Sequence, residues 1–161
     1  MARRVFFSFC YKRDIGRIGQ IRNSWVTMDT KGFTDAANWE SIKRQGEQSV
    51  KRWIDAQLDS TSVTVVLIGA ETSISKWVKY EIAKSVEDGK GVLGIYIHNV
   101  KDFRTGLTDY RGHNPLDELS LQQNGRSVLL SEIYPTYEWI NDDGQRNIVK
   151  WIEEAARKVG R

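Results

Sequence analysis

The sequence predicts an α/β domain of the flavodoxin-like, three-layer kind, with a central, mainly parallel five-stranded sheet. Short apolar segments alternate along the chain with amphipathic segments of ten or more residues, which is the pattern of parallel strands joined by helices. Two short segments, 63–68 and 92–97, are apolar on both faces, as expected for strands that helices cover on each side. The length of 161 residues suits one domain, which we assign to 1–161.

The first part of the chain is expected to supply two strands and a helix. Residues 4–9 are aromatic-rich and β-branched, which predicts the first strand. Asp14 is the candidate N-cap of a helix whose apolar residues recur at helical spacing to about Thr27. Residues 28–44 are polar and irregular, apart from a short strand near 32–34. No helix is predicted in that segment.

Two helices are expected, one before and one after the central strand. A helix over 47–58 carries its apolar residues on one face. The strand 63–68 comes next. It is followed by a helix from about residue 76 to 88, for which Ser73 or Ser75 is the candidate N-cap.

The C-terminal part is expected to complete the sheet. Another apolar strand covers 92–97, and a long polar stretch, 99–126, follows it. Residues 128–130 and 133–134 are the candidates for a last edge strand. A final amphipathic helix is predicted over 143–158.

The expected strand order selects a place for a ligand before any motif is considered. Five strands in a chain of this length suit the order 2-1-3-4-5. In such a sheet, ligands bind outside the carboxyl ends of the strands, where the order reverses between the first and third strands. We therefore expect a site among the loops after Phe9, after 32–34 and after Ile68.

Composition excludes several classes of protein. Hydrophobic residues make up 40% and charged residues 28%, which is globular rather than disordered composition. One cysteine allows no internal disulfide and no cysteine-based zinc site. No apolar run has the roughly 20 residues of a membrane helix, and no signal peptide begins the chain, so a cytoplasmic protein without a membrane partner is expected.

The net charge, 24 − 21 = +3, is concentrated in residues 1–60. This mild basic bias suits a phosphate-bearing small ligand, and it is too weak to predict nucleic-acid binding. The glycine motifs of dinucleotide-binding and P-loop proteins are absent, as is the G-x-S-x-G of hydrolases. The histidines have no metal-ligand spacing, so no metal is expected, and the first strand does not end in the acidic cluster of a response regulator.

Trp77 and Glu81 are the most informative pair. They lie one turn apart on a helix expected to begin at the predicted cleft, and so present an aromatic ring and a carboxylate side by side. On spacing alone, the alternative is a solvated glutamate on a helix surface.

The order of several short motifs resembles TIR-like domains. Arg4-Val-Phe-Phe-Ser-Phe-Cys-Tyr11 resembles their first strand and following loop, and Trp77-x-x-x-Glu81 matches their W-x-x-x-E helix. The resemblance covers most of residues 3–118 and resumes near 137–144. A wider set is similar to the branch found in the Thoeris anti-phage defence system of bacteria: Val5–Phe9, Arg22-Asn-x-Trp25-Val-Thr27, Thr61–Thr64, Val66–Gly69, Trp77–Ile82 and Asn114-Pro115.

This resemblance implies an enzyme that cleaves NAD+ and cyclises the remaining ADP-ribose into a signal that activates a partner effector. NAD+ is then a substrate, and no cofactor is implied. Glu81 is the implied catalytic residue, because a carboxylate near the ribose stabilises the oxocarbenium-like transition state. Nicotinamide is already cationic and needs no proton to leave, so the paired carboxylates of ordinary glycosidases are not required.

Other functions remain open at this point. They are a non-catalytic TIR-like module that acts by protein–protein assembly, and a plain NAD+ glycohydrolase. A constantly active enzyme would exhaust its host's NAD+, so we expect a phage-derived trigger and low resting activity. Whether the chain forms a homo-oligomer is left open, and 99–136 is interpreted as a lid or an assembly surface.

Beside Glu81, the resemblance implies a set of substrate-binding residues. Asp35 lies in the second of the three predicted loops, and Tyr11 in the first. For Phe9 the alternative is core packing, and for Trp39 it is a buried structural tryptophan rather than a base-stacking one. The full set is Phe9, Cys10, Tyr11, Asp35, Trp39, Trp77 and Asn114.

Cys10 and Asn114 carry further alternatives. Cys10 replaces what is often a polar residue or histidine in relatives, and a lone thiol without a role is the other interpretation. Asn114 either binds a ribose or phosphate, or forms a turn before Pro115. Basic residues of the N-terminal segment either meet the pyrophosphate or are simply solvated: Arg3, Arg4 and Arg13.

Overall fold

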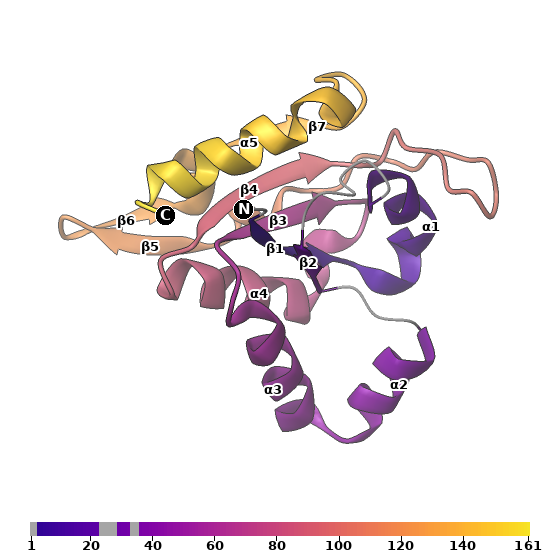
Figure 1. Ribbon diagram of the computed structural model, residues 1–161, viewed down its shortest axis with the longest axis horizontal. Coiled ribbons are helices and arrows are strands. Elements are labelled where there is room, and N and C mark those ends of the chain that lie inside the picture. Colours follow the sequence, from indigo (N-terminus) through magenta and orange to yellow (C-terminus); the bar gives the residue numbers. More distant parts are fainter. Residues whose placement is uncertain (1–2, 23–28, 33–35) are drawn as a thin grey trace.

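The computed structural model describes residues 3–22, 29–32 and 36–161, which fold around one five-stranded sheet (Figure 1). The strand order is β2-β1-β3-β4-β7, and every neighbouring pair in this sheet is parallel. This is the predicted 2-1-3-4-5 order, so the α/β, flavodoxin-like fold class is confirmed. Two further strands pair only with each other, in an antiparallel hairpin.

Strands and helices alternate along most of the chain. The strands are β1 (Arg4–Phe9), β2 (Asp29–Lys31), β3 (Val63–Ile68), β4 (Gly91–Tyr96), β5 (Ser120–Gln123), β6 (Arg126–Leu129) and β7 (Thr136–Glu138). The α-helices are α1 (Tyr11–Arg22), α2 (Ala36–Arg44), α3 (Glu47–Leu58), α4 (Lys76–Glu87) and α5 (Gly144–Lys158). Among the described residues, no helix is both long and apolar enough to cross a membrane.

Helices cover both faces of the sheet. Helices α1 and α5 pack on one face, and α3 and α4 pack on the other, with α2 beside α3 (Figure 1). The side chains of β3 are buried over its whole length, as its apolar sequence predicts. Helix α5 turns its apolar stripe inward, and Ile148 and Ile152 are fully buried there.

The N-terminal elements differ from the prediction in two places. Helix α1 begins at Tyr11, so Asp14 is a buried residue inside the helix and not its N-cap. Its backbone N–H already donates to the carbonyl of Cys10. The short strand comes before 32–34, at Asp29–Lys31, and residues 33–35 lie outside the described residues.

Helix α2 is an α-helix that the prediction missed. Its nine residues carry few apolar side chains, so they give a weak helical period. Two of these side chains, Trp39 and Ile42, pack against the buried residues of α3 and β1. Tertiary packing therefore stabilises a helix that the local sequence hardly specifies.

The predicted edge strand at 128–130 and 133–134 is wrong. The fifth strand of the sheet is 136–138, which pairs with β4 through Tyr137. Residues 126–129 pair instead with 120–123 in the hairpin, whose turn holds Asn124 and Gly125 at positive φ. An Asn-Gly pair between short strands signals such a hairpin, so this turn was readable from the sequence.

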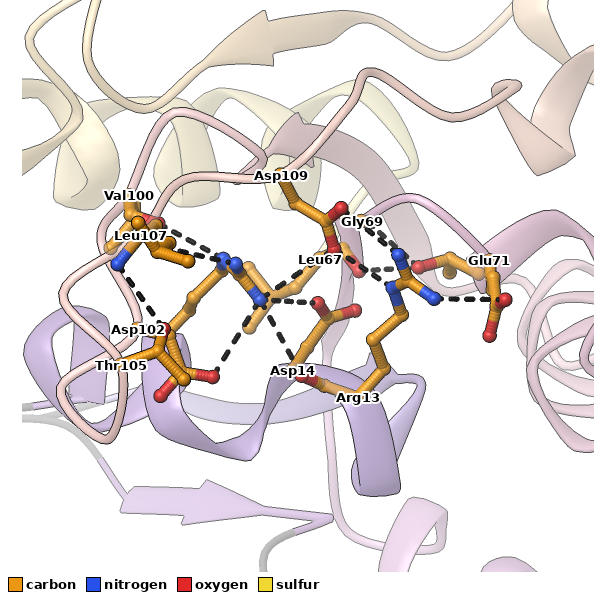
Figure 2. Close-up of polar contacts among 12 residues, drawn as sticks. Arg13, Asp14, Leu67, Gly69, Glu71, Val100, Asp102, Thr105, Leu107 and Asp109 are labelled. Atoms are coloured by element: carbon orange, nitrogen blue, oxygen red, sulfur yellow. Dashed lines mark hydrogen bonds and ion pairs between the residues drawn. The ribbon is translucent and has the colours of Figure 1, made fainter.

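A cluster of charged side chains ties the segment 99–109 to α1 (Figure 2). The guanidinium of Arg17 is buried, and its Nε donates to the carbonyl of Val100 at 2.9 Å. The same group lies 3.5–3.9 Å from three carboxylates, those of Asp14, Asp102 and Asp109. A long segment without a helix or strand is thereby held in one place.

Burial also raises the pKa of Asp14, to about 6. One of its carboxylate oxygens, Oδ2, has no hydrogen-bond partner in the described structure. A Cβ on Gly69 would come within 2.2 Å of that oxygen, so the backbone after β3 can approach α1 only as glycine.

We expect Arg17→Leu to lower the free energy of unfolding by about 3–5 kcal/mol, because it leaves the buried carboxylates of Asp14 and Asp102 without their shared cation. Urea titration monitored by circular dichroism measures the change. Arg146→Leu is the control, since the side chain of Arg146 is 85% exposed, and a change within about 0.5 kcal/mol is expected there. Equal effects of the two substitutions would contradict a structural role for the cluster.

Candidate functional site

A cavity of about 180 Å³ lies at the carboxyl ends of the first strands. Cys10 and Tyr11 follow β1, Gly32 follows β2, and Ser75 lies in the loop between β3 and α4. These are the three loops that the strand order selects. Typical ligand sites have volumes of about 300–1,000 Å³. This smaller cavity therefore suits one end of a dinucleotide rather than all of it.

Helix α4 brings an aromatic ring and a carboxylate to this cavity. The Ser75 side chain caps the helix by accepting a hydrogen bond from the backbone N–H of Val78 at 3.3 Å, which confirms one of the two predicted caps. Val78 and Ile82 pack into the core, and this fixes the rotation of the helix. Trp77 and Glu81, on the adjoining face, both line the cavity.

The carboxyl group of Glu81 is almost completely withdrawn from water. The residue is 7% exposed, and Ser8 Oγ on β1 donates to Glu81 Oε1 at 2.7 Å. Burial raises the pKa of Glu81 to about 8, against the smaller opposing effect of the Ser8 hydrogen bond. Glu81 is therefore largely protonated at neutral pH.

Aromatic side chains form much of the remaining wall. The rings of Trp39 and Trp53 are tilted against each other, with centroids 5.6 Å apart. Phe9 and Tyr11 stack at 5.8 Å beside the end of β1. With Trp77, they give the cavity flat apolar surfaces of the kind that bind planar rings, including cationic ones.

Among the described residues, two lysines line this cavity. Lys12 of α1 and Lys43 of α2 line it, and Lys43 also pairs with Glu40 at 2.8 Å. The arginines considered for this role lie elsewhere. Arg13 is bound by Asp109 and Glu71, while Arg3 and Arg4 lie at the opposite, amino end of β1.

The structure brings six of the eight predicted site residues together. Asp35 lies outside the described residues. Asn114 is not among the lining residues. It caps a short 3₁₀ helix, where its Oδ1 accepts from the N–H of Leu116 at 3.0 Å, and its Nδ2 donates to Thr136. The six lining residues are Phe9, Cys10, Tyr11, Trp39, Trp77 and Glu81.

The alternative interpretations of Phe9 and Trp39 are both partly right. Each is half-buried, packs against a core cluster and lines the cavity as well. Cys10 is a free, half-buried thiol whose pKa is raised by burial, so it is not an activated nucleophile.

Sequence reasoning missed several residues of the site. The sequence contained one sign of the role of Ser8. It is a hydroxyl within an apolar run, and it shares with Phe6 the face of β1 that meets α3 and α4. Lys43 and Trp53 gave none, since their place depends on how α2 packs on α3. The lining residues that were not predicted are Phe7, Lys12, Gly32, Lys43, Trp53 and Ser75.

A buried carboxyl, flat aromatic walls and lysines at one cavity suit a specific kind of ligand. The aromatic rings suit a planar cation, the carboxylate suits a centre that develops positive charge, and the lysines suit phosphates. Within the described residues, no group of three or more histidine, cysteine, aspartate or glutamate side chains could hold a metal ion.

Comparison with known proteins shows which family the chain resembles. Residues 6–102 match the family described as Thoeris protein ThsB, TIR-like domain. The chain is also 34% identical over 192 aligned positions to a protein of Bacillus cereus (strain MSX-D12) named "Putative cyclic ADP-D-ribose synthase ThsB1". That alignment covers 94% of this chain and all of the relative.

We expect Glu81→Gln to stabilise the fold at high pH. The pKa of Glu81 is near 8 in the folded chain and near its ordinary 4.5 when unfolded. The stability that follows from this difference is present below pH 4.5 and is lost as the pH rises through 8. Glutamine never ionises, so the variant should gain on the order of 3–5 kcal/mol at pH 9 and little at pH 5.

Urea titrations at both pH values measure this difference. Glu118→Gln is the matched control, since the Glu118 carboxylate is 3.5 Å from Lys79 and exposed to water. A gain for Glu81→Gln that did not depend on pH would contradict the raised pKa.

Proposed function

The chain belongs to the ThsB family of TIR-like domains, and on this premise we propose that it cleaves NAD+ at the nicotinamide–ribose bond and cyclises the ADP-ribose. The observation that carries the proposal is the Glu81 carboxyl, buried at an aromatic-walled cavity at the carboxyl ends of the parallel strands. The name of the Bacillus cereus relative, a cyclic ADP-D-ribose synthase, supports the same reaction class.

The cleavage step needs little more than Glu81 and the aromatic walls. The pyridinium ring of nicotinamide is held against a tryptophan face such as that of Trp77, with the adjoining ribose at Glu81. As the C–N bond breaks, nicotinamide leaves with the bonding electron pair as a neutral molecule, and positive charge moves to the ribose. The Glu81 carboxylate stabilises that charge, in a site where little water screens it.

Substrate binding itself promotes the charged form of Glu81. In the protein alone its pKa is about 8, whereas a pyridinium cation within a few ångströms lowers the pKa of a carboxyl. The pyridinium cation of the bound substrate thus favours the carboxylate that assists cleavage of the bond between nicotinamide and ribose. In the free protein, activity at low substrate should rise with pH through the titration of Glu81.

The nucleophile that captures the ribose cation decides the product. Water gives ADP-ribose, whereas an atom of the substrate's own adenine or ribose gives a cyclic product. A dinucleotide folded over the small cavity favours the internal nucleophile by proximity. In the Thoeris setting, we propose that the cyclic product is a signal for a partner effector and that a phage-derived trigger raises a low resting activity.

The first test is product analysis with Glu81→Gln. We expect the parent protein, incubated with NAD+ in lysate of phage-infected cells, to form a species with the mass of ADP-ribose minus water. The variant should form it at least about 100-fold more slowly, because the neutral amide cannot stabilise the developing charge. Chromatography with mass spectrometry measures the products.

The control is again Glu118→Gln, which removes a carboxylate outside the cavity and should leave the rate unchanged. If ADP-ribose were the sole product, the protein would be a glycohydrolase and not a cyclase. Intact NAD+ under every condition would overturn the enzyme and favour a binding module.

A second test concerns the phosphates. We expect Lys12→Met and Lys43→Met each to raise KM for NAD+ roughly three- to tenfold with little change in kcat, since each removes a cation that binds ground state and transition state alike. Steady-state kinetics measures both constants. Lys79→Met is the control, because Lys79 pairs with Glu118 away from the cavity. A fall in kcat alone would contradict a phosphate-binding role.

A further inference from the structure

We propose that Ser8 is a positioning residue for Glu81: its hydroxyl holds one carboxylate oxygen against β1 and favours the ionised form, while the other oxygen stays available to the substrate. This inference rests on the proposed function for its link to catalysis. Ser8 belongs to the sheet and does not line the cavity. Its proposed role is to control the ionisation and orientation of Glu81, which does line the cavity.

The geometry of the pair carries the argument. Ser8 is fully buried in β1, opposite Val66 of β3, so its backbone cannot shift without disrupting the centre of the sheet. Its Oγ donates to Glu81 Oε1 at 2.7 Å, which is the usual distance of a well-formed O–H···O hydrogen bond. The hydrogen bond thereby joins one carboxyl oxygen of Glu81 to a buried strand of the sheet.

The surroundings of Glu81 offer little else that favours its charge. The titratable side chains that line the same cavity are Cys10 and Tyr11 near the end of β1, Lys12 on α1 and Lys43 on α2. The side chains that line the cavity from α3 and from the start of α4 are uncharged. Burial raises the pKa of Glu81, and the Ser8 hydrogen bond is the influence that lowers it.

A hydroxyl is well suited to this position, because it donates to a carboxylate and can equally accept from a carboxylic acid. Ser8 can therefore remain bonded to Glu81 as the latter loses its proton on substrate binding. A lysine or arginine there would hold Glu81 permanently ionised, and alanine would leave its charge without a donor.

The closing experiment compares Ser8→Ala with Ser85→Ala. Ser85 is a matched control: it is also fully buried, and its hydroxyl bonds the backbone carbonyl of Glu81 and Thr64 Oγ1, each at 2.7 Å, but not the carboxyl group. Both variants lose one buried hydroxyl beside the same residue. Thermal unfolding of each measures the purely structural cost.

The primary readout is the titration of the Glu81 carboxyl, followed by NMR in protein labelled with ¹³C at the glutamate carboxyl and assigned against Glu81→Gln. We expect Ser8→Ala to move the midpoint upward by about one pH unit from the parent value near 8, and Ser85→Ala to leave it unchanged. The acidic limb of kcat/KM for NAD+ against pH should shift in parallel, giving about tenfold lower kcat/KM at pH 7 for Ser8→Ala.

The outcomes separate this inference from the proposed function. An unchanged midpoint in Ser8→Ala, or an equal shift in Ser85→Ala, would overturn the role of Ser8. A shifted midpoint without a shifted rate profile would overturn its link to catalysis. If no variant or parent cleaves NAD+, the proposed function fails, while a shift confined to Ser8→Ala still supports the control of Glu81 ionisation.

Discussion

The parallel pairing of β1 with β3 is the constraint on which the rest of the site depends. Five consecutive residue pairs, from Val5–Val63 to Phe9–Leu67, set the two strands in register, so their carboxyl ends finish together. The chain must then leave β1 and β3 at the same edge of the sheet. Helix α4 begins there, and its second turn lies against the end of β1. The contact between Ser8 and Glu81 follows from that register.

This arrangement places a carboxyl group where its charge is costly. Glu81 lies among apolar and aromatic side chains, and a solvated glutamate on the same helix would be more stable. The cost is chemically useful, because a carboxylate in a dry cavity acts strongly on a developing positive charge. Under the proposed function, stability and activity thus impose opposite demands on Glu81, as is common at active sites.

The two sides of the sheet divide the tasks of the fold. On the side of α3 and α4, the core opens into the cavity, and α2 closes part of its wall. On the side of α1, the buried Arg17 binds the carbonyls and carboxylates of the segment 99–109, which has no regular structure of its own. In the sequence these charges look like part of a mixed-charge surface, but in the structure they hold a long loop against α1.

The strand order, the helices with strong apolar periodicity and the pairing of Trp77 with Glu81 could be predicted from the sequence, because each depends on local spacing or on rules of parallel sheets. The helix α2, the edge strand at 136–138 and the contribution of Lys43 were decided only by tertiary structure. Their local patterns are weak, so packing against residues distant in the chain selects their conformation. The ionisation of Glu81 belongs to the same class, since burial by several elements, and no neighbour in sequence, raises its pKa.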